Sequence, residues 1–128
     1  MSMGYKPLRR PRSPKPKRRP SATLTAQLRD QLGVSRPVLA RLLGLSERTL
    51  GDLERGGRSA SDSARRRLAE ADRLYRKLCR VIKPHAVGPW LVTPNKSFGG
   101  FKPLELIERG ESDRLWHMIY ELEAGDAF

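Results

Sequence analysis

The amino-acid sequence predicts an all-α fold, and three observations support that prediction. Leu24, Leu28 and Leu32 recur every four residues, as side chains on one face of a helix do. A longer apolar stripe, at spacings of three and four, runs from Leu68 to Ile82. Ser, Gly and Pro stand at the ends of such stretches, where they start and stop helices. A chain of 128 residues forms one domain of this kind, or two very small ones that share a core.

The first helix is expected over residues 21–34. Gly33 ends it, because glycine takes left-handed backbone angles without a steric penalty. Ser35 stands where its hydroxyl can cap a second helix. Pro37 then falls in the first turn of that second helix, where proline is tolerated.

Two short helices joined by a tight turn are expected within residues 36–56. Ala40 is small enough for two helices to cross closely, and Gly44 can take the left-handed angles that end the first of them. Ser46 can cap the second helix by accepting hydrogen bonds from its free backbone amides. This spacing is typical of a helix-turn-helix, and a helical pair that only packs is the alternative.

The second of these helices has an apolar and a polar side. Leu50 and Leu53 are three residues apart and face the core together. The polar side suits the major groove of DNA, where Arg48 can pair with both acceptors of a guanine. Two acidic side chains on the same side weaken binding. The basic segment of residues 1–20 and a second copy of the chain are therefore expected to supply most of the affinity. The predicted DNA contacts are Arg36, Ser46, Glu47, Arg48, Thr49, Asp52 and Arg55, with Arg58 on a phosphate.

The distribution of charge also favours a nucleic-acid partner. The chain has 26 Lys and Arg against 14 Asp and Glu, a net charge of +12. Residues 1–20 hold eight basic residues, five prolines and no acid, so we expect a disordered arm that follows DNA phosphates or enters a minor groove. A merely solubilising tail is the alternative. Residues 103–128 carry two basic and seven acidic residues, a net −5, which suits a basic partner surface.

A long helix is expected over residues 59–83, starting at Ser59, Ser61 or Asp62. Its apolar stripe packs into the chain or, alternatively, against a second copy, which makes this helix a candidate for dimerisation. The basic residues on its other side are expected in solvent. Pro84 ends the helix.

The region from residue 85 to residue 103 is dense in Gly and Pro but also in aromatic residues. A flexible linker does not need aromatic side chains, so we expect an ordered loop tied to a core or a partner. Pro103 then fits the first turn of a short helix through Glu108, and a last helix is expected over residues 112–123.

No catalytic or metal-binding pattern appears in the sequence. His85 and His117 stand 32 residues apart, without Cys or acidic residues at ligand spacing. Cys79 falls on the apolar stripe and is expected to be a packed thiol. No apolar run approaches the ~20 residues of a membrane helix. We therefore expect a cytoplasmic protein that is not an enzyme and that needs no cofactor.

The C-terminal part carries a distinctive motif. Trp90-Leu91-x-x-Pro94-Asn95 is followed by Gly99-Gly100-x-x-Pro103-Leu104-Glu105-Leu106-Ile107, with Gly125 near the end. Together with the pattern in residues 36–56, this motif resembles the MbcA/ParS/Xre antitoxins over residues 22–125. The basic arm is longer than expected for that family, and the segment between Gly110 and Trp116 is short and acidic.

The sequence is expected to form four regions, and the resemblance implies two activities. The regions are a basic arm (1–20), an Xre/Cro-like helix-turn-helix (21–58), a long connecting or dimerisation helix (59–83) and a small helical C-terminal toxin-binding domain (84–128). Members of the family block a RES-domain toxin that degrades NAD⁺ and repress their own operon. The resemblance thus implies an antitoxin of a type II toxin–antitoxin system that binds its toxin and promoter DNA, with homodimer formation expected.

The expected toxin contacts lie in the C-terminal domain. Trp90 and Trp116 are expected mainly in its core, and Phe98 and Phe101 mainly at the contact. The predicted toxin-binding residues are Trp90, Leu91, Asn95, Phe98, Gly99, Gly100, Phe101, Pro103, Leu104, Gly125, Asp126 and Phe128. Two other functions stay open. One is a stand-alone repressor whose C-terminal region only dimerises; the other is a non-specific nucleic-acid-binding protein that depends on its arm.

Overall fold

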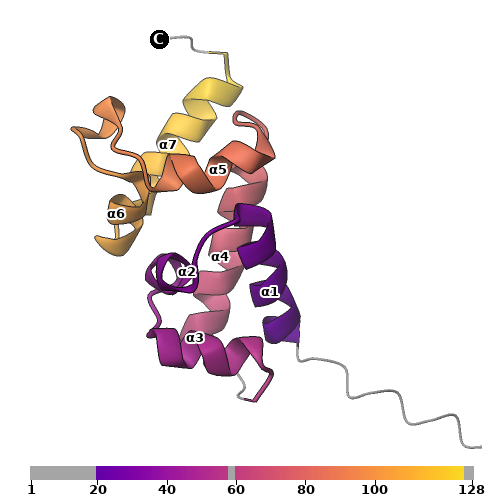
Figure 1. The fold of residues 1–128 in the computed structure, drawn as a ribbon. Helices are drawn as coiled ribbons and strands as arrows, with labels where there is room; N and C mark the ends of the chain where they lie inside the picture. The colour runs from indigo at the N-terminus through magenta and orange to yellow at the C-terminus, as the bar shows by residue number, and fades with distance from the viewer. Residues whose placement is uncertain (1–19, 58–59, 126–128) are drawn as a thin grey trace, which may run out of the picture.

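The computed structural model describes residues 20–57 and 60–125, and within them the ordered elements are all helices (Figure 1). The predicted all-α fold is therefore confirmed for these residues. Residues 1–19 of the predicted arm, together with Arg58, Asp126 and Phe128, lie outside the described part. The elements are α1 (Pro20–Leu32), α2 (Arg36–Leu43), α3 (Glu47–Glu54), α4 (Asp62–Leu78), α5 (Pro84–Leu91), the 3-10 helix η1 (Lys96–Phe98), α6 (Pro103–Glu108) and α7 (Ser112–Glu123).

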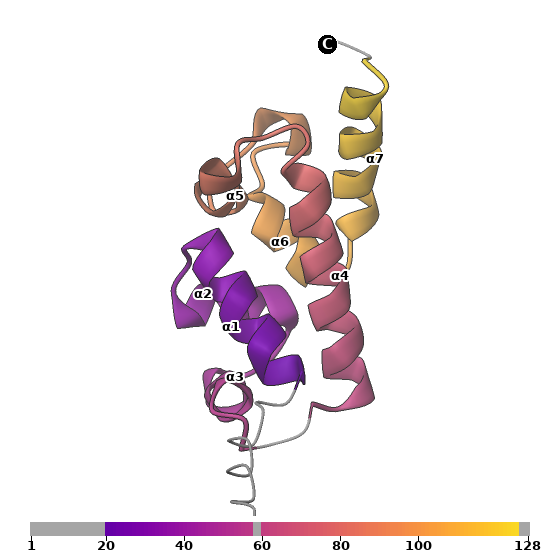
Figure 2. The ribbon, with the colours of Figure 1, turned by 90° about the vertical axis from the view of Figure 1, so that its right-hand side faces the viewer.

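The 17-residue helix α4 forms the long axis of the described structure. Figures 1 and 2 show α3 near one end of this helix and α7 packed along the other end. α1 contacts both α4 and α5, and α6 lies between α2 and α7. α1 and α7 thus contact different parts of α4 along its length, and α3 and α7 lie far apart.

Serines and glycines start and stop the helices where the sequence predicts. The hydroxyl of Ser35 accepts from the amide of Val38, and that of Ser61 accepts from the amide of Ala64 at 3.1 Å. Gly44 ends α2 with φ 66°, in the left-handed region that only glycine enters without strain. These local signals fix the helix boundaries before any packing is considered.

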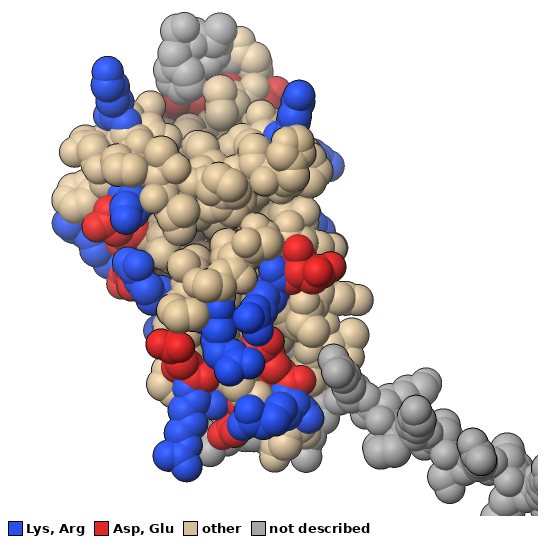
Figure 3. All heavy atoms as spheres, viewed as in Figure 1, with Lys and Arg blue, Asp and Glu red and all other residues tan. Residues whose placement is uncertain are grey.

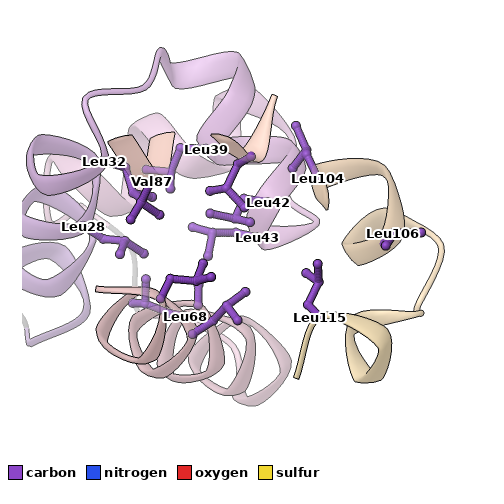
Figure 4. Packing of buried hydrophobic residues seen from close by; sticks show 14 of the residues in the cluster. Leu28, Leu32, Leu39, Leu42, Leu43, Leu68, Val87, Leu104, Leu106 and Leu115 are labelled. Atoms are coloured by element: carbon purple, nitrogen blue, oxygen red, sulfur yellow. The ribbon is translucent and has the colours of Figure 1, made fainter. Parts of the chain in front are cut away.

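One hydrophobic core connects both halves of the chain (Figure 4). It contains Leu28 from α1 and Leu39 from α2, and also Leu104 from α6 and Leu115 from α7, all with 0% exposure. Burial of a leucine side chain stabilises a fold by roughly 1.5–3 kcal/mol. The N-terminal and C-terminal halves therefore stabilise each other through shared side chains.

The apolar stripe of α4 is buried inside this core. Leu68, Leu74 and Leu78 have exposed fractions of 5% or less. The alternative that this stripe packs against a second copy is therefore wrong. α4 also ends at Leu78, earlier than predicted, because the amides of Arg80 and Val81 bond to the carbonyls of Lys77 and Leu78, three residues back, and this tightened turn interrupts the α-helical pattern.

The loop predicted over residues 85–103 is in fact partly helical. Pro84 opens α5, where its missing amide donor costs nothing, instead of only ending the preceding helix. Pro89 lies inside α5 but on an exposed position, and Val87 and Leu91 bury the opposite side at 0% and 3% exposure. Tertiary burial thus outweighs the poor helix propensity of this stretch.

A close backbone contact joins α5 to α1. A Cβ placed on Gly88 would lie 2.1 Å from the carbonyl oxygen of Leu32. No side chain fits at that distance, so α5 crosses the end of α1 only because residue 88 is glycine. This contact fixes the angle at which the C-terminal half meets the first helix.

An ion pair with two hydrogen bonds ties α2 to α6. Arg41 donates to both carboxylate oxygens of Glu108, at 2.9 and 2.7 Å. The hydrogen bond from Arg41 lowers the pKa of Glu108, although partial burial opposes this shift. The same bond raises the pKa of Arg41. The pair links the first helix of the turn motif to the C-terminal half at the surface.

Candidate nucleic-acid interface and partner surface

Two leucines anchor α3 and set which side of it faces outward. Leu50 is fully buried in the main core, and Leu53, 2% exposed, packs with Ala60 and Ala64 in a smaller cluster. The prediction that both leucines face the interior is confirmed. The side of α3 opposite to them lies at the surface of the molecule.

The start of α3 is closed by a serine cap. The hydroxyl of Ser46 accepts from the amide of Thr49 at 3.0 Å and donates to the Thr49 hydroxyl at 2.9 Å. Both predicted DNA contacts therefore satisfy each other, and their first role is to hold the tight turn. Contact with DNA through the Ser46 hydroxyl has to share or exchange these bonds.

Glu47 and Arg48 occupy the first two positions of α3 and are exposed. Neither side chain has a hydrogen bond or an ion pair with any residue in 20–57 or 60–125. Among the charged side chains of α3, these two therefore remain available for hydrogen bonds to a partner.

The remaining charges near α3 are paired. Arg55 bonds to Asp52 at 2.5 Å, and Asp52 has further interactions. Glu54, with a side chain 15% exposed, receives Arg29 of α1 at 2.8 Å and Arg36 of α2 at 3.3 Å. Figure 3 shows basic and acidic side chains interleaved at this end of the molecule. At this surface, therefore, carboxylates and arginines alternate, and the carboxylates hold the arginine side chains in place.

Apart from Gly125, the predicted toxin contacts that reach the surface gather at one closed turn after α5. The side-chain oxygen of Asn95 caps η1 by accepting from the backbone amide of Ser97. The backbone amide of Asn95 donates to the carbonyl of Phe101 at 3.0 Å. Gly99 and Gly100 form the exposed tip of this turn, with φ 65° and 88°. Phe101 is 37% exposed and lies under the guanidinium of Arg109, 4.6 Å from its ring centre. Trp90 is half-buried beside the turn.

Several other predicted contacts are buried instead. Leu91, Phe98 and Leu104 are 3%, 4% and 0% exposed, and Pro103 is also buried. Phe98 is expected at the contact, yet its ring packs in the core at an edge-to-face angle of 77° with Trp90. These buried side chains support the turn from the side of the core. Gly125 is exposed beyond the end of α7.

A groove along α7 was not predicted from the sequence. It has a volume of about 950 Å³, and apolar side chains of α7 form much of its lining. Tyr120 and Leu122 are 56% and 36% exposed, and Trp116 is half-buried with Arg73 stacked on its ring at 5.2 Å. The sequence places Trp116 on the apolar face of a helix, but that pattern does not tell which flank remains open. The groove is lined by Ser97, Phe98, Asp113, Arg114, Trp116, His117, Met118, Tyr120, Glu121 and Leu122.

Comparison with known protein families decides what α2 and α3 are. Residues 26–74 match the helix-turn-helix family model. This segment is a helix-turn-helix domain. The domain includes the end of α1, all of α2 and α3, and most of α4, so its last helix is also the helix on which α7 packs.

The fold extends the comparison beyond the helix-turn-helix domain. It is similar to the MbcA antitoxin in the crystal structure of the M. tuberculosis MbcT–MbcA toxin–antitoxin complex, with a TM-score of 0.69. The similarity covers 84% of this chain and 96% of that chain, at 20% sequence identity. It confirms, at the level of the fold, the resemblance drawn from the C-terminal motif. No curated protein matches the chain by sequence.

Membrane spans and metal sites are two other features that a helical protein can carry. In residues 20–57 and 60–125 no helix is long and apolar enough to span a bilayer. The same residues hold no group of three or more His, Cys, Asp or Glu side chains placed to bind a metal ion.

Proposed function

We propose that this protein is an antitoxin that binds DNA through α3 and a toxin through its C-terminal half. The observation that carries the proposal is the fold shared with MbcA over 84% of the chain, because it includes both the helix-turn-helix domain and the helices after it. We further propose that the toxin is a RES-domain protein that degrades NAD⁺, and that the chain represses its own operon.

The DNA-binding part of this proposal is supported by the geometry of α3. Its apolar side is buried and its charged side is at the surface, as a helix that enters a major groove requires. Helix-turn-helix proteins usually read two half-sites, so we propose that a homodimer binds the operator. The stripe of α4 is not available for dimerisation, which leaves surfaces such as the groove along α7.

The toxin-binding part is supported by two neighbouring surfaces in the C-terminal half. One is the glycine-tipped turn that presents Phe101, and the other is the groove that presents Tyr120. Exposed aromatic side chains beside a groove are typical of the central contacts of protein interfaces. The surplus of acid in residues 103–128 favours a basic toxin surface. Because α3 lies at the other end of the molecule (Figure 1), DNA and toxin can bind at the same time.

The experiment that tests the proposal is co-expression of this chain with the RES-domain toxin proposed as its partner. We expect the toxin alone to stop growth and deplete NAD⁺, and the chain to restore both. A matched control is the same chain with Phe101→Asp and Tyr120→Asp, which charges both exposed contacts and is expected to abolish rescue. Failure of the unaltered chain to restore growth, while it is expressed and folded, would refute the antitoxin function.

A second candidate is a stand-alone repressor whose C-terminal half only dimerises. The helix-turn-helix match supports this function equally well, and a second copy is then the occupant of the groove along α7. The growth experiment separates the two candidates, because a stand-alone repressor does not neutralise a toxin.

A further inference from the structure

We propose that Glu47 and Arg48 together read a G·C base pair, and that Glu47 makes cytosine a requirement at that position of the DNA site. The inference rests on the proposed DNA-binding function and names the bases that this function recognises. Both residues lie at the N-terminal end of α3, which is the part of a recognition helix that contacts base edges.

The pairing of charges around α3 singles out these two residues. Asp52 is bonded to Arg55, and Glu54 to Arg29 and Arg36, so each of these carboxylates already holds a cation. Glu47 and Arg48 have no such partner within the described residues. Their hydrogen-bonding groups are therefore available to DNA. Arg55, in contrast, must first give up its bond to the carboxylate of Asp52 before it can bind DNA.

The chemistry of the two side chains matches one base pair. Guanine offers two acceptors in the major groove, which suit the donors of Arg48, and cytosine offers the N4 amino group, which suits the carboxylate of Glu47. Adenine also has an amino donor, but its N7 acceptor stands beside it and repels a carboxylate. Thymine offers an acceptor and a methyl group, and neither can donate to Glu47.

A carboxylate on a DNA-facing helix selects by exclusion as well as by attraction. Close to phosphates and without a donor, its charge opposes binding, so every site that lacks cytosine at this position is penalised. The acid that weakens α3 as a general DNA binder thereby increases its discrimination between sites.

Glu47 also has a simpler structural role, since a negative charge in the first turn interacts favourably with the helix dipole. That role affects the stability of α3 and is the same on every DNA sequence. A change in base preference is therefore the readout that distinguishes reading from helix stabilisation.

The test is selection of binding sites from a random duplex library by the full chain, followed by sequencing of the bound DNA. The parent is compared with Glu47→Gln and with Glu70→Gln, which removes an exposed carboxylate on α4. We expect the parent to select cytosine paired with guanine at one position of each half-site. In Glu47→Gln that preference falls by about five- to a hundredfold and adenine becomes accepted, because glutamine pairs with adenine. Glu70→Gln keeps the preference of the parent.

Two results would overturn the inference, and they differ in what else they refute. If Glu47→Gln selects the same bases as the parent at every position, Glu47 does not read DNA, but the DNA-binding function stands. If the parent itself selects no preferred sequence, the inference fails together with sequence-specific repression. Urea unfolding of each variant shows that the compared proteins are folded.

Discussion

At the residue scale, a few positions decide what the rest of the chain can do. Gly88 lets the backbone of α5 touch the end of α1, and Gly44 ends α2 with a left-handed φ of 66°. Arg48 is important for a different reason, because its side chain has no hydrogen bond or ion pair within the described residues and is available to a partner. Substitutions at these positions therefore separate folding from binding.

Gly88→Ala is expected to destabilise the fold by roughly 1–3 kcal/mol, because the new methyl group overlaps a backbone carbonyl that cannot rotate away. The free energy of unfolding in urea measures this change. Gly57→Ala is the matched control, since its Cβ would have its nearest contact at 3.9 Å and its φ is not left-handed. Equal stability of the two variants would show that α5 does not cross α1 at residue 88.

Arg48→Ala is expected to weaken operator binding by roughly 1–3 kcal/mol, because the bidentate contact with a guanine is lost. Gel shifts measure this loss, and rescue from the toxin should stay unchanged. Lys96→Ala removes one exposed positive charge from the C-terminal half and serves as control. If both variants lose the same affinity, Arg48 contributes only general charge and the assignment of α3 as the reading helix is weakened.

At the element scale, contacts between helices join what local signals only outline. The bond from Arg41 to Glu108 fastens α2 to α6, although α2 belongs to the helix-turn-helix domain and α6 does not. Both side chains are partly exposed, at 46% and 34%. We therefore expect a modest contribution to stability, about 0.2–1 kcal/mol, and not that of a buried pair.

The contribution of this ion pair has a defined pH dependence. The pKa of Glu108 is lowered in the folded protein, so its contribution is present above the ordinary glutamate pKa and is lost as pH falls through the lowered value. In Glu108→Gln the free energy of unfolding should therefore fall less between neutral and acidic pH than in the parent. Glu70→Gln provides the comparison for removal of an exposed carboxylate on α4. Identical pH profiles of Glu108→Gln and the parent would contradict the contribution of this pair.

The elements that the sequence predicts correctly are those with local signals. α2, α3 and α6 are framed by Ser35, Ser46 and Pro103, whose capping or first-turn chemistry depends on neighbouring residues alone. α5 escapes prediction because Pro84, Gly88 and Pro89 oppose a helix locally and only burial against α1 and α4 favours it. For the same reason the sequence gives no indication that Phe98 is buried or that the groove along α7 is open.

At the scale of the whole molecule, the two proposed functions share one core. Leu39 in the helix-turn-helix domain and Leu104 in α6 belong to the same cluster of buried side chains (Figure 4). The two halves are therefore expected to unfold together, as small domains with one core usually do. Binding at one end then stabilises the fold of the other end as well.

Coincident unfolding can be checked with two spectroscopic probes. Both tryptophans, Trp90 and Trp116, lie in the C-terminal half, so fluorescence reports on that half, whereas circular dichroism reports on all helices. We expect one urea midpoint for both signals. A fluorescence transition that clearly precedes the loss of helix would show that the C-terminal half unfolds on its own.

The most direct test of the central claim is the mass of the complex formed from this chain, the toxin proposed as its partner and promoter DNA. Size-exclusion chromatography with light scattering is suited to it. With α3 and the C-terminal surfaces at opposite ends of the molecule, we predict one species that contains all three components. A chain that binds the DNA but never the toxin would contradict the antitoxin function and leave the stand-alone repressor.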